Sequence, residues 1–263
     1  MATRAATRSG LGEWAFRGVQ VLRAVGLAGL AGFVAGLVAG GIGSRVAMRV
    51  VSLTAGHERY GEMTDAEAVV GQITAGGTAF LALFSAFIGM AIGLVYLFNN
   101  HWLPQAGARR GLLFGGLLLV TYGTLVIEGD NFDFAEFGSP ALNLLMFVAL
   151  FPLYGLVVVP AFAWLDRHVA VVPPRGLRVM GWVVLALFGL LTLCLGLFLL
   201  VAFALGEVGP ASLMSLYLVV VAPLLALWLA QRMPEKRAWL LLAFPLTFGS
   251  LFLLREVYAI YAA

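Results

Sequence analysis

Cysteine, lysine and charge are all scarce in this 263-residue chain, in which charged residues make up 11% of the sequence. A soluble domain carries about 25% charged residues. The lone cysteine, Cys194, has no partner for an intrachain disulfide, and no Cys/His spacing typical of a metal site is present. Hydrophobic residues make up 62% of the chain, which is more than a water-soluble core can bury. These proportions exclude an ordinary soluble domain and indicate a membrane protein.

The apolar stretches also lack the ionisable groups on which intramembrane chemistry depends. The single lysine, Lys236, lies in a basic loop, where it cannot form a Schiff base with a buried retinal. His57, His101 and His168 lie between the stretches, away from the places where helices hold a haem. No Asp or Glu lies near the middle of a stretch, as proton-coupled transport usually requires. The sequence therefore argues against an enzyme, and we expect no catalytic residue, no cofactor and no metal ligand.

Long apolar stretches are what the sequence has in abundance. A hydrocarbon core about 30 Å thick requires roughly 20 apolar helical residues to cross it, because only a helix satisfies its own backbone polar groups there. Seven stretches meet this requirement: 24–43, 74–98, 111–127, 141–164, 179–205, 211–231 and 238–254. The pattern predicts an all-α integral membrane protein with a bundle of about seven transmembrane helices. We expect residues 1–23 to form a basic cytoplasmic or interfacial N-terminal segment, and residues 24–263 to form a single polytopic transmembrane domain.

The distribution of charge predicts the orientation of the helices, because cytoplasmic loops carry an excess of Lys and Arg. A cytoplasmic N-terminus places all but four of the 16 basic residues inside, the exceptions being Arg45, Arg49, Arg59 and Arg255. The same assignment places all but three of the 13 acidic residues outside. It also puts every tryptophan at a cytoplasmic helix end, where indole rings favour the headgroup region. Seven crossings of the inner (cell) membrane then leave the C-terminus extracytoplasmic.

Two local patterns predict where helices begin on the outer side. Thr64 and Glu67 form a capping box, which predicts that the second transmembrane helix begins near Asp65. Ser139 followed by Pro140 is typical of an N-cap with proline at the first helical position, which predicts the start of the fourth helix.

Glycines recur every four residues in the first three stretches. Small residues at this spacing let two helix backbones approach closely in lipid, where no hydrophobic effect drives helices together. We expect them to pack helices one to three tightly, with dimerisation as the alternative. The packing glycines are Gly32, Gly36 and Gly40 in the first stretch, Gly89 and Gly93 in the second, and Gly111 and Gly115 in the third.

Polar residues gather on the predicted outer face. Arg45 and Arg49 are four residues apart and share one face of a helix. An acidic loop precedes the fourth helix and contains Glu128, Asp130, Asn131, Asp133 and Glu136. One hypothesis is a structural lock, in which the arginines pair with these carboxylates or with Glu58, Glu62, Asp65 and Glu67. The other is a cation site on the acidic loop, whose oxygens suit calcium although their spacing does not match an EF-hand. We expect Phe132, Phe134 and Phe137 to anchor the loop in the membrane interface.

The sequence predicts a multi-pass membrane protein that acts without catalysis as a structural, assembly or ligand-responsive component. The alternative is a channel or facilitator for a small solute or cation, with an acidic outer vestibule. A hydrated route past Thr121, Asn143 and Tyr154 would favour transport, whereas a dry, glycine-packed interior would oppose it. The expected partners are the lipid bilayer and either another membrane protein or a second copy of the chain. Short basic loops beside apolar helices indicate orientation, so we expect no nucleic acid.

Overall fold

The computed structural model describes residues 2–56, 60–63, 69, 72–103, 107–131, 133–169, 179–205, 209–229 and 240–262. Within these residues the regular structure is helical, apart from one isolated bridge between Met63 and Val69. Five of the described helices are long and apolar enough to cross a membrane: Phe16–Thr54, Ala75–Asn99, Pro140–His168, Val179–Ala202 and Leu240–Ala262. The molecule is therefore an all-helical protein whose apolar helices suit a membrane-embedded, multi-pass bundle.

The first helix is longer than the sequence predicts. α1 (Ala2–Gly36) continues through the π-helical segment η1 (Leu37–Gly43) into α2 (Ser44–Thr54). The chain before residue 24 is thus a direct extension of the helix and not a separate interfacial helix. The remaining elements in chain order are α3 (Ala75–Asn99), α4 (Ala108–Tyr122), η3 (Gly123–Leu125), α5 (Asp133–Glu136), α6 (Pro140–His168), α7 (Val179–Leu205), α8 (Pro210–Leu216), η5 (Tyr217–Val221), α9 (Ala222–Leu229) and α10 (Ala243–Ala262).

Of the two helix starts predicted from the sequence, one agrees with the structure and the other does not. α6 begins at Pro140 with Ser139 as its N-cap residue, although the serine side chain makes no capping hydrogen bond. α3 begins at Ala75 and not near Asp65, so that prediction is wrong. The Thr74 hydroxyl accepts a hydrogen bond from the Gly77 amide and thereby caps the helix ten residues later in the chain. The capping box itself lies in 64–68, outside the described residues.

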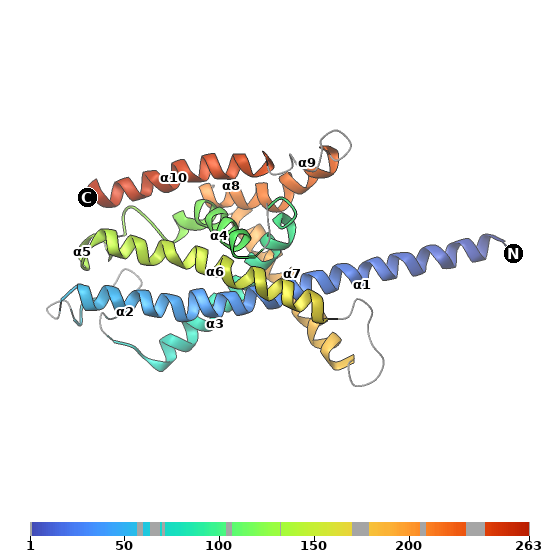
Figure 1. Ribbon diagram of the computed structural model, residues 1–263, viewed down its shortest axis with the longest axis horizontal. Coiled ribbons are helices and arrows are strands. Elements are labelled where there is room, and N and C mark those ends of the chain that lie inside the picture. The colour runs from blue at the N-terminus through green and yellow to red at the C-terminus, as the bar shows by residue number, and fades with distance from the viewer. Residues whose placement is uncertain are drawn as a thin grey trace.

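The two ends of the bundle can be told apart by the chain segments that lie at each of them (Figure 1). The N-terminus of α1 and the C-terminus of α10 lie at opposite ends of the molecule. At the C-terminal end, the Gly129 amide, which precedes α5, donates to the Glu256 carboxylate of α10 at 3.0 Å. Gly138, which follows α5 with a φ of +79°, lies against Thr54 at the end of α2. We call this end, which carries the acidic loop, the acidic end, and the opposite end the basic end.

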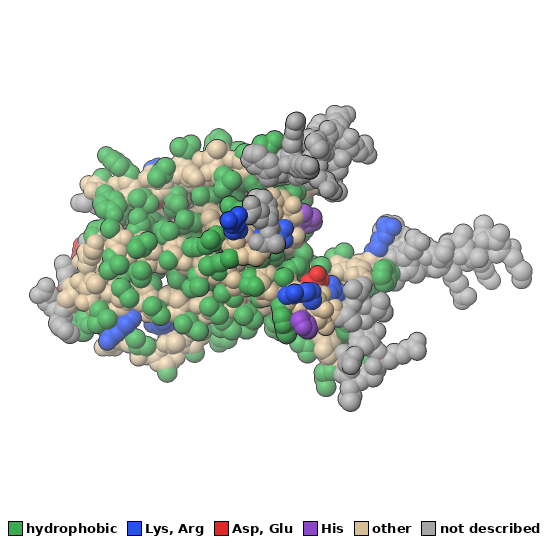
Figure 2. Space-filling model, viewed as in Figure 1, with side chains coloured by type: hydrophobic (Ala, Val, Ile, Leu, Met, Phe, Trp, Pro, Cys, Tyr) green, Lys and Arg blue, Asp and Glu red, His purple; other side chains and the backbone are tan. Residues whose placement is uncertain are grey.

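The interior is built from apolar and aromatic side chains of α1, α3, α4, α6 and η5. Phe114 of α4 is fully buried and packs against Tyr96 of α3, with ring centroids 5.1 Å apart. Tyr96 also packs edge-on against Phe162 of α6 at 5.5 Å. The flank of the bundle is covered mostly by hydrophobic side chains (Figure 2). A surface of this kind suits lipid and not water.

The third predicted helix packs differently from expectation. α4 is 15 residues long, about 22 Å, and so is shorter than the roughly 30 Å hydrocarbon core. Its glycines face α6 rather than α1 and α3: Gly111 lies against Gly155, and Gly115 against Pro152. The tight cluster of helices one to three is thus replaced by two pairs, α1 with α3 and α4 with α6. The periodicity of small residues predicts a close contact but does not name the partner helix.

Candidate functional site

The contact between α1 and α3 is made by backbone atoms, because its glycines leave no side chain between the helices. A Cβ on Gly32 would overlap the carbonyl oxygen of Gly89, and one on Gly36 would lie 3.0 Å from the Cα of Ala86. Any larger residue would force the helices apart. Five of the seven predicted packing glycines lie at the close approach of α1 and η1 to α3: Gly32, Gly36, Gly40, Gly89 and Gly93.

Tyr154 joins a third helix to this contact. It is 5% exposed, and its hydroxyl donates a 2.7 Å hydrogen bond to the Gly89 carbonyl oxygen. That oxygen is the atom that a Cβ on Gly32 would meet. A single backbone carbonyl of α3 is therefore held between α1 and α6. The buried hydroxyl of Tyr154 therefore has a hydrogen-bond partner in the interior of the bundle.

The basic end holds an ion pair that sequence reasoning missed. Arg23 on α1 is 7% exposed, and its guanidinium donates to the Asp166 carboxylate at 2.7 Å. It also donates to the backbone carbonyls of Asp166 and Val169, each at 2.7 Å. These carbonyls belong to the C-terminal end of α6, where a positive charge is favourable. Arg23 appears in the sequence as one of several loop arginines, and Asp166 lies 143 residues away, so only the packing of α1 against α6 reveals the pair.

The acidic loop is held by backbone contacts. Asn143 on α6 is 1% exposed and its side-chain amide donates to the carbonyl oxygens of Phe137 at 2.6 Å and Phe134 at 3.3 Å. The Asn131 side chain accepts from the Asp133 amide at 2.9 Å, which forms a local turn. Phe134 and Phe137 are 3% and 2% exposed, so the prediction that they anchor the loop in the interface is wrong. Phe134 packs inward in a cluster with Phe147 of α6 and Ile260 of α10. Phe132 lies outside the described residues.

The carboxylates of the acidic loop do not converge on a common point. Among the described residues, no group of three or more His, Cys, Asp or Glu side chains could hold a metal ion. Glu128, Asp133 and Glu136 each have other interaction partners. The geometry of the described chain therefore gives the cation hypothesis no set of ligands.

Arg45 and Arg49 are not joined to the acidic loop. In the described parts of the chain, the guanidinium groups of Arg45 and Arg49 make no ion pair and no hydrogen bond, although the Arg49 backbone carbonyl accepts from the Ser52 hydroxyl. The Arg45 Nε atom is buried without a partner. Glu58, Asp65 and Glu67, which the lock hypothesis also offers as partners, lie outside the described residues.

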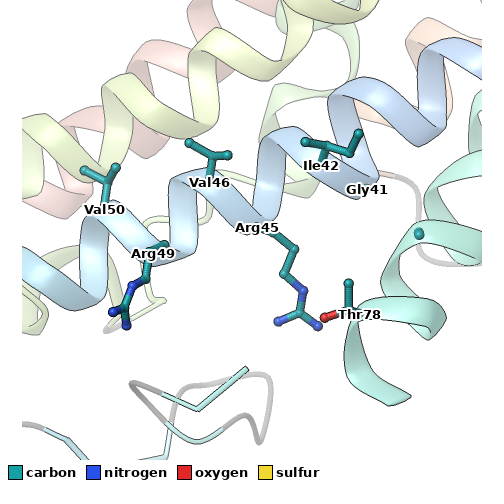
Figure 3. A pocket seen from close by; sticks show the side chains of 8 residues that line it. Gly41, Ile42, Arg45, Val46, Arg49, Val50 and Thr78 are labelled. Carbon is teal, nitrogen blue, oxygen red and sulfur yellow. The ribbon is translucent and has the colours of Figure 1, made fainter. Parts of the chain in front are cut away.

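The two arginines instead line a groove between α2 and the start of α3 (Figure 3). The groove has a volume of about 420 Å³. The Arg45 side chain reaches across toward Thr78 on α3, and Arg49 lies one turn further along α2. The remaining lining residues are Gly41, Ile42, Val46, Val50 and Ala82. The site is thus an apolar groove with two positively charged groups on its wall.

Comparison of the chain with protein-family models, curated proteins and solved structures finds no match.

Proposed function

We propose that the chain is a seven-span protein of the inner (cell) membrane, with its N-terminus in the cytoplasm and its C-terminus outside. Each of the seven apolar stretches overlaps a described helical segment. The position of the two termini at opposite ends of the bundle supports an odd number of crossings (Figure 1). The arginines near the N-terminal end, including Arg109 and Arg110 at the start of α4, support a cytoplasmic assignment for that end.

The role that the packing supports best is a non-catalytic one, as a structural, assembly or ligand-responsive component of the membrane. The observation that carries this proposal concerns the three polar side chains that a transport route would use. Thr121, Asn143 and Tyr154 are 1%, 1% and 5% exposed, and each donates a hydrogen bond to a backbone carbonyl. The bonds of Asn143 and Tyr154 join different segments of the bundle, whereas Thr121 bonds to the Leu117 carbonyl of its own helix. A hydrated path would require them to face water.

Flux measurements in liposomes that contain only this protein test the proposal. We expect no flux above that of protein-free liposomes, either of monovalent cations followed by an internal dye or of glycerol followed by osmotic swelling. Purification in mild detergent should instead recover the chain with a stoichiometric membrane-protein partner or as a defined homo-oligomer. Saturable flux of either probe would refute the non-catalytic structural role and support a channel or facilitator.

The orientation has its own test. A reporter active only in the cytoplasm, fused after Ala263, should be inactive, and a reporter that requires export should be active at the same position. Fusions after Gly107, between α3 and α4, should show the opposite pattern. A C-terminal fusion active in the cytoplasm would refute the odd number of crossings.

A further inference from the structure

The groove between α2 and α3 combines two features that occur together in sites for amphiphiles. Its walls are apolar, and Ile42 and Val46 are 65% and 56% exposed, so the groove opens onto the surface of the bundle. Its volume of about 420 Å³ lies in the range of roughly 300–1,000 Å³ typical of small-ligand pockets. In a bilayer an apolar groove on the flank of a helical bundle faces lipid.

Three positive groups lie beside the groove. Arg45 and Arg49 each carry a full positive charge, and neither forms an ion pair with another described residue. The third is the N-terminus of α3, whose first amide groups carry a partial positive charge. The Arg45 guanidinium lies directly against this N-terminus, because a Cβ on Gly77 would come within 3.1 Å of its Nη2 atom. An arginine beside a helix N-terminus is unfavourable unless an anion is also present.

One end of the groove is closed by small residues. A Cβ on Gly41 of η1 would lie 3.3 Å from the Cβ of Ala82 on α3, so the two helices are in close contact there. They diverge toward Thr78, where Arg45 bridges the gap (Figure 3). The groove is therefore narrow where Gly41 meets Ala82 and wider toward Thr78, and its two arginines lie beside the apolar side chains of Ile42, Val46 and Val50. An anionic lipid likewise carries a charged group next to an apolar chain.

The position of Arg45 and Arg49 along the chain places their side chains near the lipid headgroups. The first apolar stretch ends at residue 43, so Arg45 and Arg49 follow it within six residues, about 9 Å along a helix. Arginines at this point extend into the headgroup region of a bilayer. Phosphates of lipid headgroups lie at that level and pair well with the planar guanidinium group.

We propose that this groove binds an anionic phospholipid, with its phosphate between Arg45, Arg49 and the N-terminus of α3, and one acyl chain along Ile42, Val46 and Ala82. The proposal requires that the chain lie in a membrane but does not depend on its non-catalytic role. A second copy of the chain or a helix of another protein would have to bring acidic side chains to the two arginines, whereas an anionic lipid supplies the negative charge and the apolar chain in one molecule.

Native mass spectrometry of the full-length chain, released from phosphatidylcholine nanodiscs that contain a minor fraction of phosphatidylglycerol, tests this proposal. Wild-type protein should retain phosphatidylglycerol in preference to phosphatidylcholine. The double variant Arg45→Gln with Arg49→Gln should retain it roughly thirtyfold less, because each arginine contributes about 1 kcal/mol to anionic-lipid binding and every 1.4 kcal/mol is tenfold. Arg255→Gln, on the exposed face of α10, removes one charge away from the groove and should change retention little.

A second variant tests the apolar part and does not alter charge. Val46→Trp should fill the groove and reduce lipid retention, whereas Leu197→Trp, at a 62% exposed position on α7, adds the same bulk elsewhere and should not. Glycerol 3-phosphate, which lacks acyl chains, should not displace the bound lipid. Size-exclusion chromatography identifies any variant that fails to fold. If either the double arginine variant or Val46→Trp fails, the other one tests the proposal.

Four results would overturn the proposal. These are equal retention of the two lipids by wild type, undiminished retention by the double arginine variant, an equal loss in Arg255→Gln, and unchanged binding in Val46→Trp. Displacement by glycerol 3-phosphate would show that the arginines bind a free phosphate group instead. A shift of the variants from dimer to monomer without a lipid signal would show that a second copy of the chain occupies the groove.

Discussion

α1 and α7 are both long apolar helices, yet they pack in opposite ways. In the most apolar part of Phe16–Thr54, 61% of the residues are buried, against 17% in Val179–Ala202. α1 carries glycines and alanines at its contacts and approaches α3 backbone to backbone. α7 carries large aliphatic residues, and Leu187, Leu197 and Leu205 are 60%, 62% and 83% exposed. Mean hydropathy does not follow burial, because Leu240–Ala262 and Val179–Ala202 are both 17% buried at mean hydropathies of 1.6 and 2.8. Residue size explains the central position of α1 better, because only small residues permit close contact in lipid.

The contact of α7 with α1 follows the same rule. Gly26 and Gly29 of α1 receive Leu185 and Thr192 of α7, and Gly189 of α7 lies against Leu22 of α1, so small residues make this contact as well. Thr192, which is fully buried, bonds to the Phe188 carbonyl of its own helix at 2.6 Å. α1 therefore acts as the central helix of the bundle, and α7 contacts it along one narrow face. The wide remaining face of α7 is available to lipid or to another protein.

Substitution at the α1–α3 contact should have the largest effect. We expect Gly32→Leu to abolish folding or to destabilise the bundle by about 3 kcal/mol or more, because a Cβ there already overlaps the Gly89 carbonyl. Gly181→Leu is the matched control, since nothing lies within 4 Å of a Cβ at that position of α7. Thermal unfolding in detergent measures both. Equal destabilisation by the two variants would remove the contrast between central and peripheral helices.

Removing the buried arginine at the basic end should rank second. Arg23→Gln should lower the free energy of unfolding by about 2 kcal/mol, because it leaves the carbonyls of Asp166 and Val169 without a charged donor. Asp166→Asn should cost about 1 kcal/mol, since that carboxylate is 53% exposed and the two carbonyl contacts remain. Arg167→Gln, an exposed neighbour whose side chain donates to the Ala163 carbonyl of its own helix, should be neutral and provides the control. A larger loss in Asp166→Asn than in Arg23→Gln would contradict this ranking.

A third, smaller effect is expected at the tyrosine that reaches α3. Tyr154→Phe removes one hydrogen bond to the Gly89 carbonyl and retains the ring, so we expect a loss of about 1 kcal/mol in unfolding free energy. Tyr258→Phe, at a 74% exposed position near the C-terminus, should have no measurable effect. Chemical denaturation in detergent distinguishes the two. Equal stability of both variants would show that α6 is held to α3 by packing alone.

The smallest effect is expected on the exposed face of α7. Leu197→Ala should change stability in detergent by less than about 0.5 kcal/mol, because the side chain makes few contacts within the chain. The same variant measured in a bilayer tests whether another protein covers this face. A shift in oligomeric state there would identify α7 as an interface and not a lipid-facing helix.

Sequence reasoning located the helices well and their partners poorly. α7 has the predicted bounds, and α6 begins at the predicted proline, because hydropathy and proline act locally. The start of α3 was predicted too early in the chain because Thr64 was chosen as the N-cap in place of Thr74. The two threonines offer the same local chemistry. The two arginines lie on one helix face, as predicted, but among the described residues neither side chain forms an ion pair with the carboxylates expected to bind it. The ion pair of Arg23 was missed because nothing in the sequence relates it to a residue at the far end of α6.

The chain's composition alone determined that it forms apolar helices, because backbone polar groups can be satisfied in hydrocarbon only within a helix. Glycine spacing likewise determined where helices could approach closely. Which helices meet was decided only by the tertiary structure: α4 joins α6, α1 becomes the central helix, and a groove opens beside Arg45. The physical reason is that small-residue faces are interchangeable in sequence, and the bundle selects among them by the fit of all its side chains at once.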